Sequence, residues 1–372
     1  QCAASGVTKS YAFERPSLRT RALDVHPELI FDAASAAEHI ETELFERAGE
    51  VEIGLDRDGR RWLLAAFAED VVGELDPLKS DDVWLVSGGG SGVTAACIVG
   101  VAKASQGAEA SFHLLGRSVL IEQTAEWLDW SEEDLMKEKM SLRERLTEAS
   151  STGKVTMVEW NKAWQRFTRS RDVYKTLSQI EATGNRAFYH SIDVTDAEAL
   201  SSLGASLSNP VTGVVHGAGL EDSKLVADKA WETFDKVVRV KIDGWSALIK
   251  AVEASNGNLR FSSTFTSVAG RFGNGGQTDY AAANSILDAE MARLTAKGDC
   301  RAVAIGWTGW RDVGMATRGS IEAVFEAAGI ETLPVDVGVQ IFVDEALRGG
   351  KRRVIACGSL GLMDRFDSFR EA

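Results

Sequence analysis

From about residue 83 onward, short apolar runs alternate with longer stretches of mixed apolar and polar positions. In the longer stretches the apolar residues recur every three or four positions, as Ala283, Leu287 and Met291 do, which is the spacing of a buried helical stripe. The short runs predict buried strands at residues 83–87, 110–115, 187–194, 214–219, 302–307 and 353–357. This alternation predicts an α/β fold with a parallel, doubly wound sheet.

Two parts of the chain depart from that alternation. In residues 1–80, Ile53, Leu55 and the run 62–67 flank a charged turn at 56–60, which predicts two strands, and no catalytic grouping is visible there. Residues from about 120 to 180 are rich in Glu, Lys, Arg, Leu and Trp, with Gly153 as the only glycine or proline. This stretch is predicted to be a helical insertion that breaks at residues 150–153.

A glycine-rich turn at residues 88–94 stands directly after a predicted strand and before a helical pattern. Such a turn lets backbone N–H groups approach a pyrophosphate at the helix N-terminus, so it predicts a dinucleotide site. The next strand ends at Arg117 and Ser118, where an enzyme that selects NAD would place a carboxylate. An arginine there suits a 2′-phosphate and predicts NADPH, although a surface arginine at a strand end is the alternative.

Ser267, Tyr280 and Asn284 form the candidate catalytic group. Asn284 follows Tyr280 by one helical turn on the same face, and the glycines between Ser267 and Tyr280 predict a loop that lets the serine approach the phenol. A phenol with a pKa of about 10 needs a nearby cation to exchange protons at neutral pH. The nearest upstream lysine in a suitable helical context is Lys241.

The order Lys241, Ser267, Tyr280, Asn284, with serine and tyrosine thirteen residues apart, resembles the ketoreductase domains of polyketide and fatty acid synthases, members of the short-chain dehydrogenase/reductase superfamily. The helical insertion resembles that of polyunsaturated fatty acid synthases. The resemblance implies that Tyr280 donates a proton and that Ser267 binds the carbonyl oxygen. It also implies that Lys241 lowers the phenol pKa and that Asn284 orients Lys241 and a relay water.

The resemblance extends to the cofactor site. The glycine turn is similar to the family's T-G-G-x-G-G-x-G, with Thr94 in place of the final glycine, which bears on helix packing rather than on phosphate binding. His216 is interpreted as a wall of the cofactor site and not as a general base. The cofactor-binding residues implied are Gly88, Gly90, Ser91, Gly92, Val93, Arg117, Ser118, Asp193, Val194, His216, Gly217, Ala218 and Gly219.

Four residues are assigned to substrate orientation by the same resemblance: Asp222, Phe272, Trp310 and Met315. Ketoreductases that make the (3R)-hydroxyl carry L-D-D where this chain has Leu220-Glu221-Asp222. Those that make the (3S)-hydroxyl carry tryptophan where this chain has Phe272. Trp310 and Met315 lie in segments similar to the family's loop and lid over the site. A (3R) product is therefore expected, with a solvated acidic loop as the alternative interpretation.

The resemblance also implies a Rossmann-type fold in two parts. Residues 1–80 correspond to a truncated, cofactor-free structural subdomain, and residues 81–372 to the catalytic NADPH-binding subdomain with its insertion at about 120–180. The absence of a leader or an apolar run of about 18 residues, with glutamine as the first residue, predicts an excised piece of a longer cytoplasmic protein.

Charge and composition narrow the partners. The formal charge of −14 argues against bulk binding to nucleic acid or to a membrane surface. Two local basic stretches are either solvated faces or docking sites for an acidic partner: one contains Arg166, Arg169, Arg171 and Lys175, and the other contains Arg348, Lys351, Arg352 and Arg353. The resemblance implies that this partner is an acyl carrier protein. The four cysteines and five histidines are scattered, so neither a disulfide framework nor a metal site is predicted.

The resemblance implies NADPH-dependent reduction of a 3-ketoacyl thioester on an acyl carrier protein, within a multidomain polyunsaturated fatty acid or polyketide synthase. Two alternatives remain: a free-standing reductase of another ketone, and a catalytically silent scaffold inside a synthase. An S-adenosylmethionine methyltransferase would share the glycine-rich turn, but nothing in that class requires the spacing of Ser267, Tyr280 and Asn284.

Overall fold

The computed structural model describes residues 2–46, 49–122, 125–151, 153–298, 300–314, 325–349 and 352–361. Its main body is a seven-stranded sheet in which every adjacent pair of strands is parallel, which confirms the predicted fold class. The spatial order is β10 (Arg352–Ala356), β9 (Arg301–Trp307), β8 (Phe261–Ser267), β7 (Gly213–His216), β4 (Val83–Ser87), β5 (Ser111–Gly116) and β6 (Arg186–Ser191).

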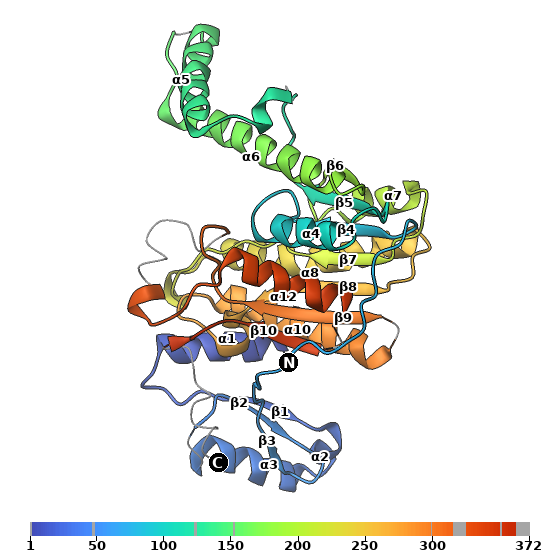
Figure 1. Cartoon of the computed structure of the whole chain (residues 1–372). Helices are drawn as coiled ribbons and strands as arrows, with labels where there is room; N and C mark the ends of the chain where they lie inside the picture. The colour runs from blue at the N-terminus through green and yellow to red at the C-terminus, as the bar shows by residue number, and fades with distance from the viewer. Residues whose placement is uncertain are drawn as a thin grey trace.

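Helices cover both faces of this sheet (Figure 1), and its central strands β4 and β7 are buried along their whole length. One face packs against α4 (Gly92–Ala104), α12 (Val335–Leu347) and the second half of α6 (Met157–Glu181). The other face packs against α7 (Ala197–Ser206), α8 (Trp231–Ala254) and α10 (Thr278–Lys297). In the first core, Trp84 is almost fully buried and stacks on Phe261 with ring centroids 5.0 Å apart.

A smaller three-stranded sheet belongs to the N-terminal part (Figure 1). β1 (Ala22–Val25) pairs in parallel with β2 (Glu52–Leu55), and β2 pairs in antiparallel fashion with β3 (Arg61–Trp62), which confirms the predicted strands around a charged turn. The turn is closed by Asp56 Oδ1, which accepts from the Arg60 N–H at 2.8 Å. β3 ends at Trp62, short of the predicted run, and Phe67 is 86% exposed. The helices of this part are α2 (Pro27–Phe31), α3 (Ala33–Glu41) and a π-helical turn, Thr42–Glu46.

The first helix, α1 (Cys2–Glu14), packs along α10, which covers the seven-stranded sheet, and contacts α9 (Val268–Phe272). Glu52 of β2 joins the small sheet to these helices, because its carboxylate pairs with Lys9 of α1 at 3.0 Å and with Arg271 of α9 at 2.6 Å. The N-terminal part is therefore held to the sheet by helices that carry the candidate site. The division of the chain at residue 80 stays a prediction.

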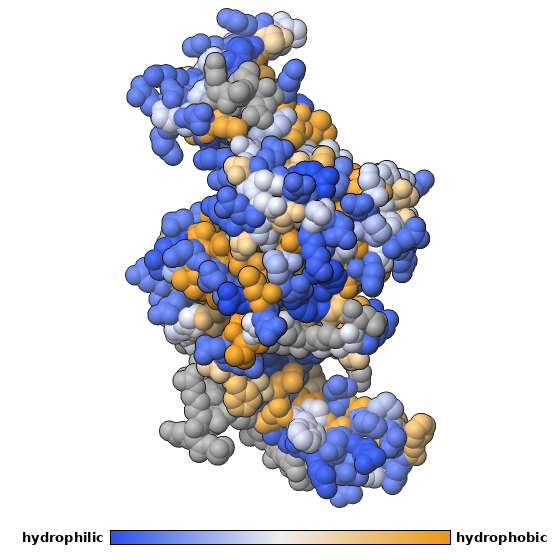
Figure 2. All heavy atoms as spheres, turned by 45° about the vertical axis from the view of Figure 1, so that its right-hand side comes forward, coloured by the Kyte–Doolittle hydropathy of each residue, from blue (hydrophilic) through white to orange (hydrophobic). Residues whose placement is uncertain are grey.

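Among its described residues, the predicted insertion contains a 3₁₀ turn, Ala125–Leu128, and two α-helices, α5 (Glu132–Ala149) and α6, which are separated near residues 150–156. Each α-helix begins with a capping box, at Ser131 and at Thr156, which satisfies the free N–H groups of its first turn. α5 and the start of α6 extend away from the sheet (Figure 1). α5 has no buried residue, and on the face shown in Figure 2 polar side chains cover most of this arm. This arm, which consists of α5 and the start of α6, is thus largely solvated on that face.

Candidate active site

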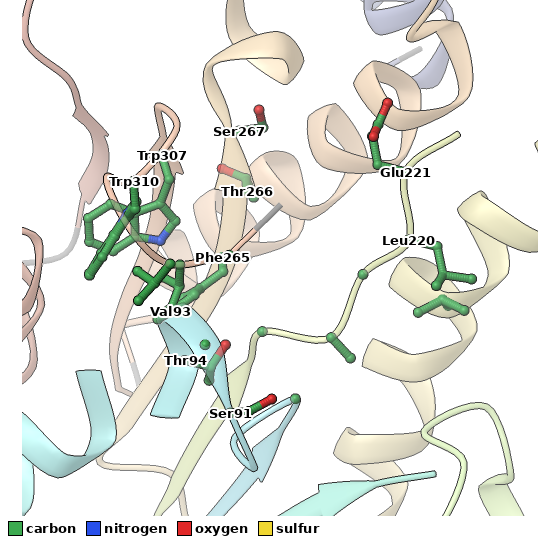
Figure 3. Close-up of a pocket in the computed structure, with 18 of the residues that line it drawn as sticks. Ser91, Val93, Thr94, Leu220, Glu221, Phe265, Thr266, Ser267, Trp307 and Trp310 are labelled. Atoms are coloured by element: carbon green, nitrogen blue, oxygen red, sulfur yellow. The ribbon is translucent and has the colours of Figure 1, made fainter. Parts of the chain in front are cut away.

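A cleft of about 1410 Å³ lies at the carboxyl ends of the strands of the large sheet (Figure 3). It is lined by residues that follow β4, β5, β7, β8 and β9, and by Lys241 and Tyr280 from helices. β4 lies between β5 and β7, so the chain order reverses at this point of the sheet. Doubly wound sheets bind their ligands in the crevice at such a switch point.

The glycine turn forms one side of this cleft, where Gly88, Ser91, Gly92 and Val93 line its surface. Helix α4 begins at Gly92, and within the described residues Ser91 makes no side-chain hydrogen bond that would cap it. Gly92 has φ +70°, and a Cβ placed on it would meet no atom within 4 Å. The first turn of α4 therefore borders the cleft at the positive end of the helix dipole, which fits the pyrophosphate of a dinucleotide.

Thr94 stands where the family motif has its last glycine, and it packs against Gly217 in the segment after β7. Thr94 is 5% exposed, and a Cβ on Gly217 would lie 2.1 Å from its Oγ1. Gly217 has no side chain, so it leaves the room that the Thr94 side chain occupies. The close packing of α4 against the segment after β7 is kept, because the pair still contains one residue without a side chain.

Gly90 and Ser118 do not line the cleft, in contrast to their assignment from sequence. Gly90 lies under α6, where a Cβ would approach Val173 Cγ2 to 2.9 Å, and its carbonyl accepts from Thr176 Oγ1 at 3.2 Å. The Ser118 carbonyl accepts from the Tyr189 hydroxyl at 3.0 Å. Both residues shape the walls of the site and do not form its surface.

Arg117, Asp193 and Val194 line the cleft beyond the glycine turn. Arg117 Nε lies 4.0 Å from Asp193 Oδ2, and the two side chains are 58% and 42% exposed. The guanidinium is therefore accessible to a ligand, as a 2′-phosphate contact requires. Asp193 Oδ1 accepts from the Thr195 N–H at 3.0 Å, which keeps the carboxylate at the strand end.

Sequence reasoning missed the contribution of α6 to this end of the cleft. The helix was assigned to an insertion without chemistry, yet it lines the cleft with Asp172, Lys175, Thr176 and Gln179. Position in the chain was the available signal, since the second half of α6 connects β5 to β6. It therefore occupies the place of the crossover helix in a βαβ unit.

The structure brings Lys241, Ser267 and Tyr280 to the same cleft from α8, the end of β8 and the first turn of α10. Ser267 Oγ accepts from the Ala269 N–H at 3.1 Å and so caps α9. Its O–H can donate to a ligand oxygen, and the hydroxyl also hydrogen-bonds with Tyr280. Lys241 is 3% exposed, and its Nζ donates to the Phe265 carbonyl at 2.5 Å.

Burial controls the proton affinities of the tyrosine and the lysine. Burial raises the pKa of Tyr280 to about 12, against an opposing effect of hydrogen bonding with Asn284 and Ser267. The net shift is opposite to the lowering that the sequence predicts for Lys241, because the burial of the phenol outweighs the effects that favour its ionised form. Burial lowers the pKa of Lys241 to about 8, with the Asp288 carboxylate opposing the shift. At neutral pH both groups carry their protons.

Asn284 lies behind Tyr280 and is fully buried. Its Nδ2 donates to the Tyr280 carbonyl at 2.8 Å, so it fixes the main chain of the first turn of α10. The prediction that Asn284 orients Lys241 needs correction, since the Phe265 carbonyl takes that place. Asn284 Oδ1 has no hydrogen-bond partner among the described residues, which leaves an acceptor for a relay water.

His216 is also fully buried and does not form the cofactor wall that the sequence predicted. Its Nε2 lies 2.9 Å from the Lys241 carbonyl and its Nδ1 lies 2.6 Å from Ser87 Oγ. Because a carbonyl only accepts, Nε2 carries the proton and Nδ1 accepts from the serine. Burial lowers the pKa of His216 to about 3, so the ring is neutral. His216 therefore holds the main chain at Lys241 in place.

Of the predicted substrate-orienting residues, Asp222 and Trp310 line the cleft. The Asp222 carboxylate pairs with Lys224 at 3.1 Å. Phe272 is 4% exposed and packs with Val268 and Leu360, so the structure does not bring it to the cleft surface. Met315 lies outside the described residues.

Trp307 lines the cleft beside Trp310, and the sequence analysis did not assign it (Figure 3). The two rings meet edge to face with centroids 5.1 Å apart. Both indole N–H groups lack a hydrogen-bond partner among the described residues.

A doubly wound sheet with a glycine turn, and with a lysine, a serine and a tyrosine at the carboxyl ends of its strands, defines a short-chain reductase fold with a nicotinamide site. Comparison of families agrees with this class, since the model described as "KR domain" matches residues 84–312. The chain belongs to this ketoreductase family, whose members reduce ketones with a nicotinamide cofactor.

Curated relatives are large synthases. One is a polyunsaturated fatty acid synthase protein of Thraustochytrium sp., to which the chain is 30% identical over 295 residues, which are 77% of this chain and 10% of that protein. Another is mellein synthase of Phaeosphaeria nodorum, to which it is 34% identical over 163 residues, which are 43% of this chain and 9% of that protein. The chain therefore spans about a tenth of the length of these relatives.

Solved structures show the same fold. A ketoreductase domain from the bacillaene assembly line superposes with a TM-score of 0.71 at 21% identity, over 98% of this chain and 76% of that one. The first-module ketoreductase of phoslactomycin biosynthesis in Streptomyces sp. HK803 gives a TM-score of 0.71 at 21% identity, over 98% of this chain and 72% of that one.

Two kinds of feature are absent from the described residues. No helix there combines the length and the apolar character needed to cross a membrane. No group of three or more His, Cys, Asp or Glu side chains in that part of the chain is arranged to hold a metal ion.

Proposed function

We propose that this chain reduces a 3-ketoacyl thioester on an acyl carrier protein to the (3R)-hydroxyacyl thioester, with NADPH as reductant, inside a multidomain polyunsaturated fatty acid or polyketide synthase. The observation that carries the proposal is one cleft that brings Lys241, Ser267 and Tyr280 together beside the open N-terminus of α4. The kinship with large synthases supports the assignment of a synthase substrate.

The residues of the cleft divide the reaction between them. A bound nicotinamide cofactor supplies the hydride for the carbonyl carbon. Tyr280 donates its proton to the carbonyl oxygen, which receives the electron pair of the broken C=O π bond. Ser267 donates a hydrogen bond to the same oxygen as its negative charge develops. The Lys241 ammonium stabilises the phenolate that Tyr280 leaves, because an opposite charge favours the ionised form.

NADPH is the proposed cofactor because Arg117 lines the cleft with an accessible guanidinium. Arg117→Ala is expected to raise KM for NADPH about 10- to 100-fold, since a charge-assisted contact to the 2′-phosphate contributes on the order of 1.5–3 kcal/mol. KM for NADH, which has no 2′-phosphate, should change little. Steady-state kinetics with both cofactors measure the difference, and Arg57→Ala, at an exposed arginine of the small unit, is the control. Equal changes for NADPH and NADH would contradict the role of Arg117.

The dependence of the reduction rate on pH should reflect the protonation of Lys241. Its pKa is lowered to about 8 by burial, so the ammonium is present below that pH and is lost above it. Reduction is therefore expected to slow as the pH rises through about 8, because the phenolate loses its counter-charge. The pH profile of kcat/KM measures this limb. In Lys241→Arg, whose charge persists at high pH, the fall should move to higher pH, and an unmoved limb would show that another group titrates.

An acidic carrier protein is the proposed partner, and the contacts of the basic stretch at residues 166–175 suggest which of its side chains would bind it. Arg171 donates to the carbonyls of Trp127 at 2.7 Å and Trp130 at 3.0 Å, so it supports the fold of the arm. Lys175 lines the cleft. Arg166 and Arg169 are exposed and are proposed for docking, and Arg166 also donates from Nε to the Val119 carbonyl at 3.3 Å. The cytoplasmic location stays a prediction.

The test of the function is direct. The purified chain is incubated with NADPH and a 3-ketoacyl thioester of a short carrier mimic, and NADPH oxidation and the chirality of the alcohol are measured. A (3R) alcohol is expected, with Asp222 at the rim guiding entry of the acyl chain. A predominantly (3S) alcohol would refute the stereochemical assignment. Oxidation with simple ketones but not with thioesters would favour a reductase of another ketone, and no oxidation with either would favour a silent scaffold.

A further inference from the structure

Glu14, the last residue of α1, connects two loops that are distant from it in sequence. Its Oε1 accepts from the Gly276 N–H at 3.0 Å, and its Oε2 accepts from the Val226 N–H at 2.9 Å. The donors lie 262 and 212 residues further along the chain. Each carboxylate oxygen thus serves a different loop, and both bonds are of the charge-assisted kind.

The two loops form the rim of the cleft beside Tyr280. The first, residues 220–229, follows β7 and lines the cleft with Glu221 and Asp222. The second, residues 273–277, joins α9 to α10 and lines the cleft with Asn274 and Gln277. They also bond to each other, since the Lys224 N–H donates to the Gly276 carbonyl at 3.0 Å and Gln277 Nε2 donates to Glu221 Oε1 at 3.3 Å.

The position of α1 is itself closely constrained. Gly273 has φ +79°, and a Cβ on it would lie 2.5 Å from the main chain of Lys9. The Asn274 N–H donates to Ser10 Oγ at 3.2 Å. At the other end of the helix, a Cβ on Gly6 would lie 2.5 Å from the Ala281 carbonyl oxygen, next to Tyr280. α1 therefore lies in main-chain contact with α10, which carries Tyr280, and with the second loop. These contacts fix the position of the helix from which the Glu14 side chain extends.

We infer that Glu14 is a positioning residue that holds the two rim loops together and so sets the path by which the acyl chain reaches Tyr280. This inference rests on the proposed function, because it assigns the rim to the entry of the acyl thioester. Glu14 does not line the cleft, so its influence on the reaction passes through the loops. The glycine turn and Arg117 lie outside both loops, so NADPH affinity should not depend on Glu14.

Three substitutions separate the carboxylate from its neighbours. Glu14→Ala removes both acceptors, Glu14→Gln keeps one acceptor oxygen, and Glu14→Asp keeps the charge on a shorter side chain. Glu38→Gln, at an exposed glutamate of α3, is the matched control. In Glu14→Ala the ratio of the two alcohol enantiomers should fall and KM for the thioester should rise, each about tenfold, as for the loss of charge-assisted hydrogen bonds. Glu14→Gln should be intermediate, Glu14→Asp should recover part of the effect, and the dissociation constant for NADPH should stay unchanged.

Amide hydrogen exchange supplies a readout that needs no substrate. Peptides covering residues 220–229 and 273–277 should exchange faster in Glu14→Ala, while peptides covering β4 and α4 keep their protection. Unchanged exchange in both loops would overturn the inference, even if the wild-type chain reduced no thioester and the proposed function had failed. Faster exchange with an unchanged enantiomer ratio and KM would also overturn it, because the loops would then move without affecting entry. A loss of NADPH binding would overturn it too, since Glu14 would then have a general structural role.

Discussion

Tyr280→Phe is expected to lower kcat for ketone reduction by at least about a hundredfold, with little change in the dissociation constant for NADPH. The substitution removes one oxygen and keeps the ring, so the packing of a residue that is 8% exposed is preserved. Burial raises the pKa of the phenol to about 12, so Tyr280 holds a proton at neutral pH and can give it to the carbonyl oxygen. Without it, the developing alkoxide keeps the hydrogen bond from Ser267 but has no positioned group that gives it a proton.

Turnover by steady-state kinetics and NADPH affinity by fluorescence titration measure the two halves of this expectation. Tyr11→Phe on α1 is the matched control, because it removes the same oxygen from a tyrosine that does not line the cleft. A Tyr280→Phe enzyme with near-normal kcat would refute the role of Tyr280 as proton donor. A parallel loss of NADPH binding would show that the phenol supports the cofactor site.

Ser267→Ala should lower kcat about 100- to 1000-fold, the usual effect of losing one donor to a developing oxyanion. Ser267 Oγ accepts from the Ala269 N–H, and the serine hydroxyl, which also hydrogen-bonds with Tyr280, is the proposed donor to the substrate oxygen. The same bond caps α9, and its loss should cost about 0.5–2 kcal/mol of stability. Kinetics and thermal unfolding together separate the two effects.

Ser267→Thr is the informative companion, because it keeps both the hydroxyl donor and the cap. Ser246→Ala, at an exposed serine of α8, controls for the loss of a hydroxyl elsewhere. If Ser267→Ala unfolded at a lower temperature but kept its kcat, the serine would be a helix cap and nothing more. If Ser267→Thr recovered stability but not turnover, the position of the donor, and not its presence alone, would decide the rate.

The sequence by itself was sufficient for the fold class and for the family, and it named the Lys241, Ser267 and Tyr280 that the structure brings to one cleft. The strands are short and wholly apolar, and stretches with helical periodicity separate them. A sheet with helices on both of its faces buries all of these strands. Tyr280 and Asn284 share one helix face whatever the tertiary context, and a serine at a strand end before a glycine loop is also a local feature. Such short-range patterns can be read from the sequence because the backbone geometry of helices and strands sets them, independently of the tertiary packing.

Only the tertiary structure decided which side chains reach the cleft surface. Phe272 and His216 stand at plausible positions in the chain but are buried by partners from other segments. The opposite shifts in pKa of Tyr280 and Lys241 arise from burial, which no spacing reports. Glu14 meets Val226 and Gly276 across more than 200 residues. Contacts of this kind depend on how whole elements pack, and packing is a property of volumes and distances that a one-dimensional pattern does not contain.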